Sequence, residues 1–180
     1  MKLDSPFKYI GKFNVNPLLK YLPPTSDPLW SKNTFRQTLY NGHRDTKSII
    51  FIWESNGDGD YNINDQELIN SSLGKEVIKI VDKIKENYNN SSVSKLMIVS
   101  MIPKGLIDYH KDGGILTKMR RIHLPLLTDR NCIFEIDGTR FSFPKGFCFE
   151  FDNTRTHSVD NRSEIERIHI ILDLIVEDGK

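Results

Sequence analysis

Short apolar runs alternate with turn residues throughout the second half of the chain. The runs are rich in β-branched and aromatic residues, and Gly, Pro, Asp and Asn cluster between them, for example in 103–105, 112–114 and 137–138. Many short strands at this spacing are typical of a β-sandwich or barrel of the jelly-roll kind. The predicted strands are 96–101, 106–110, 121–127, 132–136, 140–143, 147–151, 157–159 and 167–176.

The first half of the chain follows another pattern. Prolines interrupt residues 1–46, which are predicted to be irregular apart from a short helix at 18–22, and the apolar run 48–53 predicts a buried strand. A short helix is expected at 65–71, and apolar residues at helical spacing predict a longer one at 75–88. We therefore predict a mainly β (α+β) fold: a double-stranded β-helix (jelly roll, cupin-like) with N-terminal helices packed on one face.

The length of 180 residues suits a single domain over 1–180. Within it, we expect residues 1–94 to form a helical or irregular N-terminal layer and residues 95–176 to form a jelly-roll core that carries a metal site. Hydrophobic residues make up 38% of the chain and charged residues 27%, which is a mixture that can build a core.

Charge and cysteine content exclude several classes of protein. The formal net charge of +1 argues against a dedicated nucleic-acid binder, and no apolar run reaches the roughly 20 residues of a membrane span. The N-terminus lacks the apolar region of a signal peptide. Cys132 and Cys148 are too few for a disulfide framework or a cysteine-rich zinc site, so we expect buried thiols in a cytoplasmic protein.

Two histidines and one aspartate form a candidate metal site. His110 and Asp112 lie at the end of a predicted strand, and His157 begins another strand 47 positions later. A jelly roll can return the distal strand beside the first, and two imidazoles with one carboxylate bind Fe(II) on one face in non-haem oxygenases. Arg167 opens a further strand, and an inward-pointing arginine there would need an anion such as a dicarboxylate cosubstrate.

Several blocks resemble the aspartyl/asparaginyl β-hydroxylase family. Segment 121–126 (RIHLPL) looks like that family's R-x-H-[LI]-P-L block, and further matching pieces follow in order over about residues 96–175: 136–138 (IDG), 145–146 (KG), 151–153 (FDN), 157–161 (HSVDN) and 167–173 (RIHIILD). The resemblance implies a double-stranded β-helix that uses Fe(II), 2-oxoglutarate and O2.

The resemblance also assigns roles to individual residues. His110 and His157 match the iron-binding histidines, and Arg167 matches the arginine that binds the distal carboxylate of 2-oxoglutarate. Some members, including the animal enzyme that names the family, have glycine in place of Asp112 and bind iron with two histidines, whereas Asp112 here predicts a complete triad. Three further residues match positions near the cosubstrate or substrate: Arg121, His123 and Ser100.

The expected function is hydroxylation of an amino-acid or peptidyl side chain, with decarboxylation of 2-oxoglutarate to succinate and CO2. The substrate would be a free amino acid, a peptide or a protein, and basic residues near the proposed site favour one with a carboxylate: Lys118, Arg120, Arg121, Arg130 and Arg140. The alternative is a non-redox cupin-like metal-binding protein, either an isomerase or a small-molecule-binding module, which would not need Arg167. A third possibility is a binding module without metal.

Three other features favour structural roles. His43 belongs to a second H-x-D triplet without a distal partner, and we expect it to be structural or at the surface. His169 alternates with Arg167 and is expected in the core. Loop 54–65 resembles a dockerin-type calcium loop, but a loop that caps the following helix fits the preceding strand better.

Overall fold

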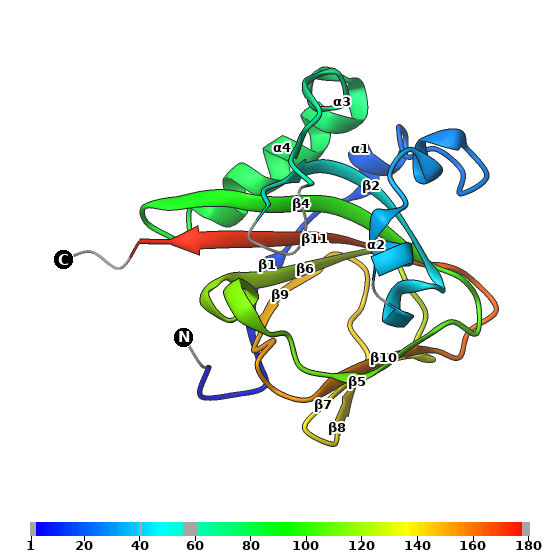
Figure 1. The fold of residues 1–180 in the computed structure, drawn as a ribbon, viewed down its shortest axis with the longest axis vertical. Helices are drawn as coiled ribbons and strands as arrows, with labels where there is room; N and C mark the ends of the chain where they lie inside the picture. The colour runs from blue at the N-terminus through cyan, green and yellow to red at the C-terminus, as the bar shows by residue number, and fades with distance from the viewer. Residues whose placement is uncertain (1–2, 40, 56–60, 178–180) are drawn as a thin grey trace.

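Two β-sheets face each other in the computed structural model, which describes residues 3–39, 41–55 and 61–177 (Figure 1). The large sheet has the order β1-β9-β6-β11-β4-β2-β3, and the small sheet has the order β5-β10-β7-β8. The strands are β1 (Phe7–Lys12), β2 (Thr46–Trp53), β3 (Ile63–Asn64), β4 (Ser91–Met101), β5 (Leu106–His110), β6 (Arg120–Leu127), β7 (Cys132–Ile136), β8 (Thr139–Phe141), β9 (Phe147–Phe151), β10 (His157–Asn161) and β11 (Arg167–Val176).

From β4 onward, the chain crosses repeatedly between the two sheets. Strands β4, β6, β9 and β11 belong to the large sheet, and β5, β7, β8 and β10 belong to the small one. All the pairings are antiparallel. This connectivity is the predicted double-stranded β-helix, and the mainly β fold is confirmed.

Several of the helices cover the outer face of the large sheet. The α-helices are α1 (Asn16–Leu19), α2 (Phe35–Leu39), α3 (Gln66–Asn70) and α4 (Ser72–Lys85), and the 3-10 helices are η1 (Pro28–Ser31), η2 (Asn41–His43) and η3 (Gly114–Lys118). Figure 1 shows α3 and α4 on the side of β4 and β2 that faces away from the small sheet. Helix α4 buries Val77, Val81 and Ile84 in one apolar cluster with residues of β4, β6 and β11.

Strand alternation gives β11 two chemically different faces. Ile168, Ile170 and Leu172 belong to the apolar cluster beneath the helices. Arg167 and Asp173 lie at alternate positions, so they point to the other face, between the sheets. Aromatic rings fill part of that interior, where the rings of Phe143 and Phe149 stack with centroids 3.7 Å apart.

The N-terminal segment departs from the prediction at β1 and α2, both of which lie in the stretch predicted to be irregular. Residues 7–12, predicted to be irregular, form β1 at the edge of the large sheet beside β9. The strand carries a register shift between Tyr9 and Gly11, and only some of its residues are half-buried. An edge strand of this kind lacks a clean alternation of apolar and polar residues. Residues before 95 therefore extend the large sheet with β1, β2 and β3 as well as covering it.

Candidate metal centre and its cavity

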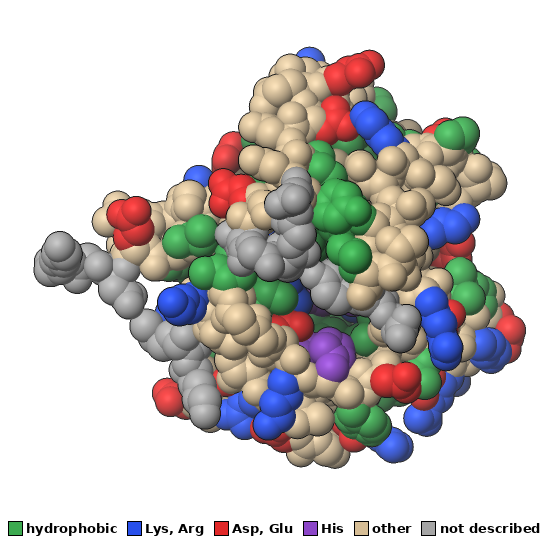
Figure 2. Space-filling view, in the orientation of Figure 1, with side chains coloured by type: hydrophobic (Ala, Val, Ile, Leu, Met, Phe, Trp, Pro, Cys, Tyr) green, Lys and Arg blue, Asp and Glu red, His purple; other side chains and the backbone are tan. Residues whose placement is uncertain are grey.

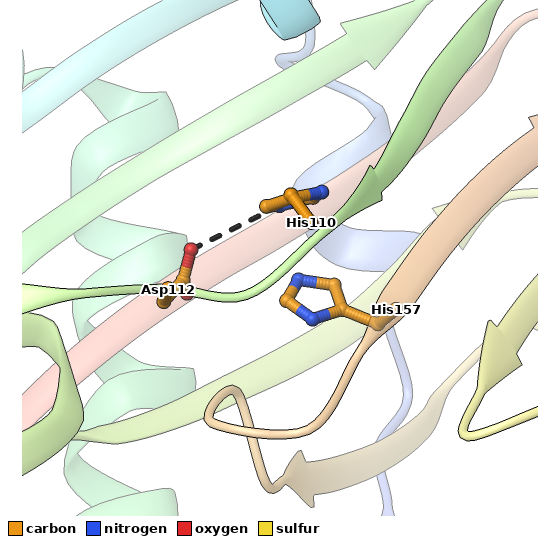
Figure 3. A group of neighbouring side chains, drawn as sticks. All are labelled: His110, Asp112 and His157. Carbon is orange, nitrogen blue, oxygen red and sulfur yellow. Dashed lines mark ion pairs between the residues drawn. The ribbon is translucent and has the colours of Figure 1, made fainter.

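His110 and His157 lie opposite each other in the small sheet. They are paired positions in the register of β5 and β10, which explains how residues 47 positions apart in sequence meet. Asp112 follows two residues after His110, beyond the end of β5. One potential ligand atom from each of the three residues lies within 4.8 Å of the other two (Figure 3). The structure therefore brings together the three residues that the sequence predicts as metal ligands.

Backbone hydrogen bonds fix both imidazoles in one tautomer. Nδ1 of His110 lies 2.8 Å from the carbonyl oxygen of Asp108, and Nδ1 of His157 lies 2.9 Å from that of Arg155. A carbonyl oxygen can only accept, so each Nδ1 carries the proton and donates it. Each Nε2 then keeps its lone pair for a metal. Burial lowers the pKa of His157 to about 4, which keeps this ring neutral.

Asp112 is held at both its backbone and its side chain. Its backbone N–H donates to the carbonyl oxygen of Asn153 at 3.0 Å, and Asn153 Nδ2 donates to Asp112 Oδ2 at 3.1 Å. The guanidinium of Arg121 donates through Nη1 to the same oxygen. The other oxygen, Oδ1, lies 3.9 Å from Nε2 of His110. Burial opposes the charge on Asp112, but Arg121 and the hydrogen bond from Asn153 hold the pKa of its carboxyl below the usual value.

Arg121 joins Asp112 to a second carboxylate. Its Nε and Nη2 donate to the two oxygens of Asp173 at 2.8 and 2.7 Å. Asp173 is fully buried, and the side chain of Arg121 is 15% exposed. Burial alone would lower the pKa of Arg121, and the two carboxylates raise it instead. Arg121 is therefore neutralised within the protein by two acidic side chains.

Arg167 has a different environment. It is 3% exposed, its Nη2 donates to Nδ1 of His169 at 2.9 Å, and its guanidinium carbon lies 6.0 Å from the ring centroid of Phe134. Among the described residues, no carboxylate lies within ion-pair distance of it. Burial lowers its pKa, yet guanidinium groups stay protonated in proteins. A buried cation without an acidic partner favours an external anion.

A cavity of about 820 Å³ connects these residues. His110, Asp112, His157 and Arg167 all line it. Figure 2 shows a hollow in the face of the molecule in which a histidine side chain is visible, with charged side chains around it. The predicted metal ligands and the predicted anion-binding arginine therefore share one cavity.

The other sequence-predicted residues are placed differently. Arg121 and His123 line the cavity. His123 is buried among aromatic rings, and its Nδ1 has no hydrogen-bond partner among the residues that the structure describes. The structure does not bring Ser100 to the cavity: it lies on β4 in the same alternation as Ile98, toward the helices, whereas its neighbour Val99 lines the cavity.

Sequence reasoning missed several residues of this cavity, two of which lie next to each other. His43, expected to be structural or at the surface, lines it, and so does Arg36 of α2. Arg36 is buried, its Nη1 donates to Ser48 Oγ at 2.5 Å, and its Nη2 lies 3.4 Å from Nε2 of His43. Burial and the charge of Arg36 lower the pKa of His43 to about 2. No sequence signal marks these residues, because only the tertiary approach of α2 and η2 brings them to the cavity.

The basic residues near the site in sequence mostly serve other partners. Arg120 pairs with Glu150, and Arg140 pairs with Glu135. Of the five basic residues that the sequence placed near the site, Arg121 lines the cavity and the other four do not: Lys118, Arg120, Arg130 and Arg140. The basic residues that do line the cavity are Arg36, Arg44, Lys95, Lys111, Arg121 and Arg167. Aspartates are fewer among the lining residues: Asp108 and Asp112.

The remaining expectations concern residues outside the cavity. Cys132 and Cys148 are buried free thiols, as expected, and His169 is buried, as expected for a core residue. Loop 54–65 lies partly outside the described residues, but Asp65 caps α3 by accepting a hydrogen bond from the backbone N–H of Leu68 at 3.0 Å. Among the described residues, no helix is both long enough and apolar enough to cross a bilayer.

The donor set fits a ferrous ion. Two imidazoles whose Nδ1 atoms bond backbone carbonyls leave Nε2 for a metal, and a carboxylate with a depressed pKa presents Oδ1. This combination of ligands, with the opposite side open, suits non-haem Fe(II). The cavity beyond the three ligands would accommodate a cosubstrate that extends toward Arg167.

Comparisons with known proteins agree with this chemistry. A family model described as Aspartyl/Asparaginyl beta-hydroxylase matches residues 32–176. No curated protein matches the chain in sequence.

Three solved structures share the fold. The viral collagen prolyl hydroxylase of Paramecium bursaria Chlorella virus-1, in a complex with 2-oxoglutarate, is 11% identical with a TM-score of 0.55, over 97% of this chain and 98% of that chain. An oxidoreductase of the 2OG-Fe(II) oxygenase family from Burkholderia pseudomallei is 12% identical with a TM-score of 0.54, over 93% and 81%. The nickel complex of the non-heme monooxygenase ThoJ is 10% identical with a TM-score of 0.55, over 95% and 74%.

Proposed function

The chain belongs to the aspartyl/asparaginyl β-hydroxylase family and is an oxygenase of the Fe(II)/2-oxoglutarate type, and we propose that it hydroxylates an amino-acid side chain, free or within a peptide, while 2-oxoglutarate is decarboxylated to succinate and CO2. One observation supports the proposal most strongly. A triad of metal-ligand type and a buried arginine without a carboxylate partner among the described residues line the same cavity.

Each residue has a task that follows from its chemistry. His110, Asp112 and His157 would hold the iron, which when bound supplies the activation of O2 and the oxidative chemistry. The guanidinium of Arg167 would bind the distal carboxylate of 2-oxoglutarate through paired hydrogen bonds. Phe134 and Phe151 line the cavity and would shield the reacting groups from water. His123, predicted from sequence to lie near the cosubstrate, has an Nδ1 without a hydrogen-bond partner in the described part of the chain.

The charges around the cavity favour a substrate that carries a carboxylate. Among the described residues that line it, six are basic and two are aspartates, and three of the basic residues are buried: Arg36, Lys95 and Arg167. Low-dielectric walls with an excess of one sign concentrate ligands of the opposite sign. We therefore propose an acidic amino acid or a peptide with an acidic side chain as the substrate.

Substrate-dependent succinate formation tests the function. The metal-free protein would be supplied with Fe(II), ascorbate and 2-oxoglutarate, and a panel of amino acids and acidic or neutral peptides would be screened for stimulated succinate release. We expect stimulation by at least one carboxylate-bearing compound and none in the His157→Ala variant. Arg140→Met is the control, because Arg140 pairs with Glu135 outside the cavity.

The same assay decides against the alternative function. A non-redox cupin-like metal-binding protein would bind Fe(II) but release no succinate with any compound of the panel. Arg167 argues against it, since a protein that only binds metal gains nothing from a buried guanidinium that lacks an acidic partner among the described residues.

A further inference from the structure

Arg121 matches a family position near the cosubstrate, yet its contacts in this protein lead elsewhere. Three of its nitrogen atoms donate to carboxylates: Nη1 to Asp112, and Nε and Nη2 to Asp173. We propose that Arg121, anchored by Asp173, is a positioning residue that turns the Asp112 carboxylate toward the metal, rather than a ligand of 2-oxoglutarate. The proposal rests on the metal site of the proposed function.

The two oxygens of Asp112 have different partners. Oδ2 accepts from Arg121 and from Asn153 Nδ2, so both hydrogen bonds fall on the same oxygen. Oδ1 is the oxygen that faces His110. Two donors on Oδ2 fix the rotation of the carboxylate and leave Oδ1 for the metal, which makes Asp112 a ligand through a single oxygen.

Asp173 explains why Arg121 stays in place. Residues 121 and 173 are paired positions in the register of β6 and β11, so the ion pair is built into the large sheet. Asp173 is fully buried and does not line the cavity, whereas Arg121 does. The pair therefore extends from the interior of the sheet to the edge of the metal site. Partners of metal ligands typically change metal affinity about 10- to 100-fold when removed.

Asp173 offers the cleanest variant, because a residue outside the cavity cannot contact the cosubstrate. Asp173→Asn keeps the volume and one oxygen acceptor but removes the charge that anchors Arg121. The double variant Arg121→Met with Asp173→Leu removes the ion pair within the large sheet, so Asp112 is the carboxylate that loses its cation. Arg120→Met is the matched control, since Arg120 is the neighbouring residue, does not line the cavity and pairs with Glu150.

The measurement is Co(II) binding to the metal-free protein without 2-oxoglutarate, followed by the Co(II) absorption spectrum. We expect the double variant to raise the Kd for Co(II) about 10-fold or more and Asp173→Asn to raise it by a smaller factor. The Co(II) spectrum should be altered in both variants. Arg120→Met should stay within about twofold of the unmodified protein. Circular dichroism confirms that each variant is folded.

Coupling to Asp112 separates positioning from a general effect on the fold. In an Asp112→Ala background, the double variant should change the Kd by less than about twofold, because the carboxylate that Arg121 positions is gone. The proposal is overturned if Asp173→Asn and the double variant bind Co(II) like the unmodified protein, or if the loss persists in the Asp112→Ala background. Co(II) binding needs no turnover, so absent succinate formation would refute the proposed function and leave this result standing.

Discussion

Two arginines on adjacent strands of the large sheet are in opposite electrostatic situations. Arg121 of β6 contacts two carboxylates, Asp112 and Asp173. Arg167 of β11 contacts His169 and has no carboxylate within ion-pair distance among the described residues. Both line the same cavity. The protein therefore supplies the counter-charge for Arg121, whereas the proposed function assigns the counter-charge of Arg167 to a ligand.

Replacing either arginine by methionine should change the free energy of unfolding, and the larger effect is expected at Arg121. Removing it as Arg121→Met leaves Asp173 buried without its cation, which costs about 3–5 kcal/mol of the free energy of unfolding. Chemical denaturation measures this loss.

A second variant isolates the cause of that loss. Adding Asp173→Leu to Arg121→Met removes the fully buried carboxylate and leaves only Asp112, which lines the cavity, without Arg121, so most of the lost stability should return. If the double variant were as unstable as the single one, the unpaired carboxylate would not be the cause.

Cosubstrate binding should depend on Arg167 instead. In Arg167→Met, the 2-oxoglutarate concentration for half-maximal succinate formation should rise about 100-fold, since losing one partner of a buried charge pair costs about 2–5 kcal/mol. The free energy of unfolding should stay the same or rise, because the variant removes a buried cation that has no acidic partner among the described residues. The Kd for Co(II) should not change. An unchanged 2-oxoglutarate requirement would remove Arg167 from the cosubstrate site.

Acid should lower the free energy of unfolding through a buried histidine, His123. Burial and nearby arginines hold the pKa of His123 well below its usual value, so the folded state keeps the ring neutral while the unfolded chain binds a proton below about pH 6.5. The free energy of unfolding is therefore unaffected by the titration of His123 above that pH. It decreases as the pH falls below it, by about 2 kcal/mol for one such histidine at pH 5.

The variant His123→Leu reports this contribution. Leucine fits among Phe134, Phe149 and Phe151, which surround the ring, and does not titrate. Denaturation midpoints at pH 7.5 and pH 5 should differ less in this variant than in the unmodified protein. Equal differences would mean that His123 is not neutral in the folded state.

Much of the fold and the central triad could be predicted because their signals are local. Alternating apolar runs predict strands such as β5, β7 and β11, and the triplet around His110 with a distant His157 is recognisable as a ligand pattern. The partners of Asp112 could not be predicted, because they depend on strand register, which pairs residues 121 and 173. The place of Arg36 depends on how α2 packs over the open end of the sandwich, and no residue spacing reports that.

The smallest effect is expected at Ser100, which tests how far a family position can be transferred by sequence alone. Side chains on a strand alternate between two faces, so a shift of one residue in the alignment moves a side chain from the cavity to the opposite face. Val99 lines the cavity and Ser100 does not. Ser100→Ala should therefore leave the 2-oxoglutarate requirement within about twofold, far from the change expected for Arg167→Met. A tenfold or larger rise would restore the sequence-based role of Ser100 and mean that β4 presents its other face to the cosubstrate.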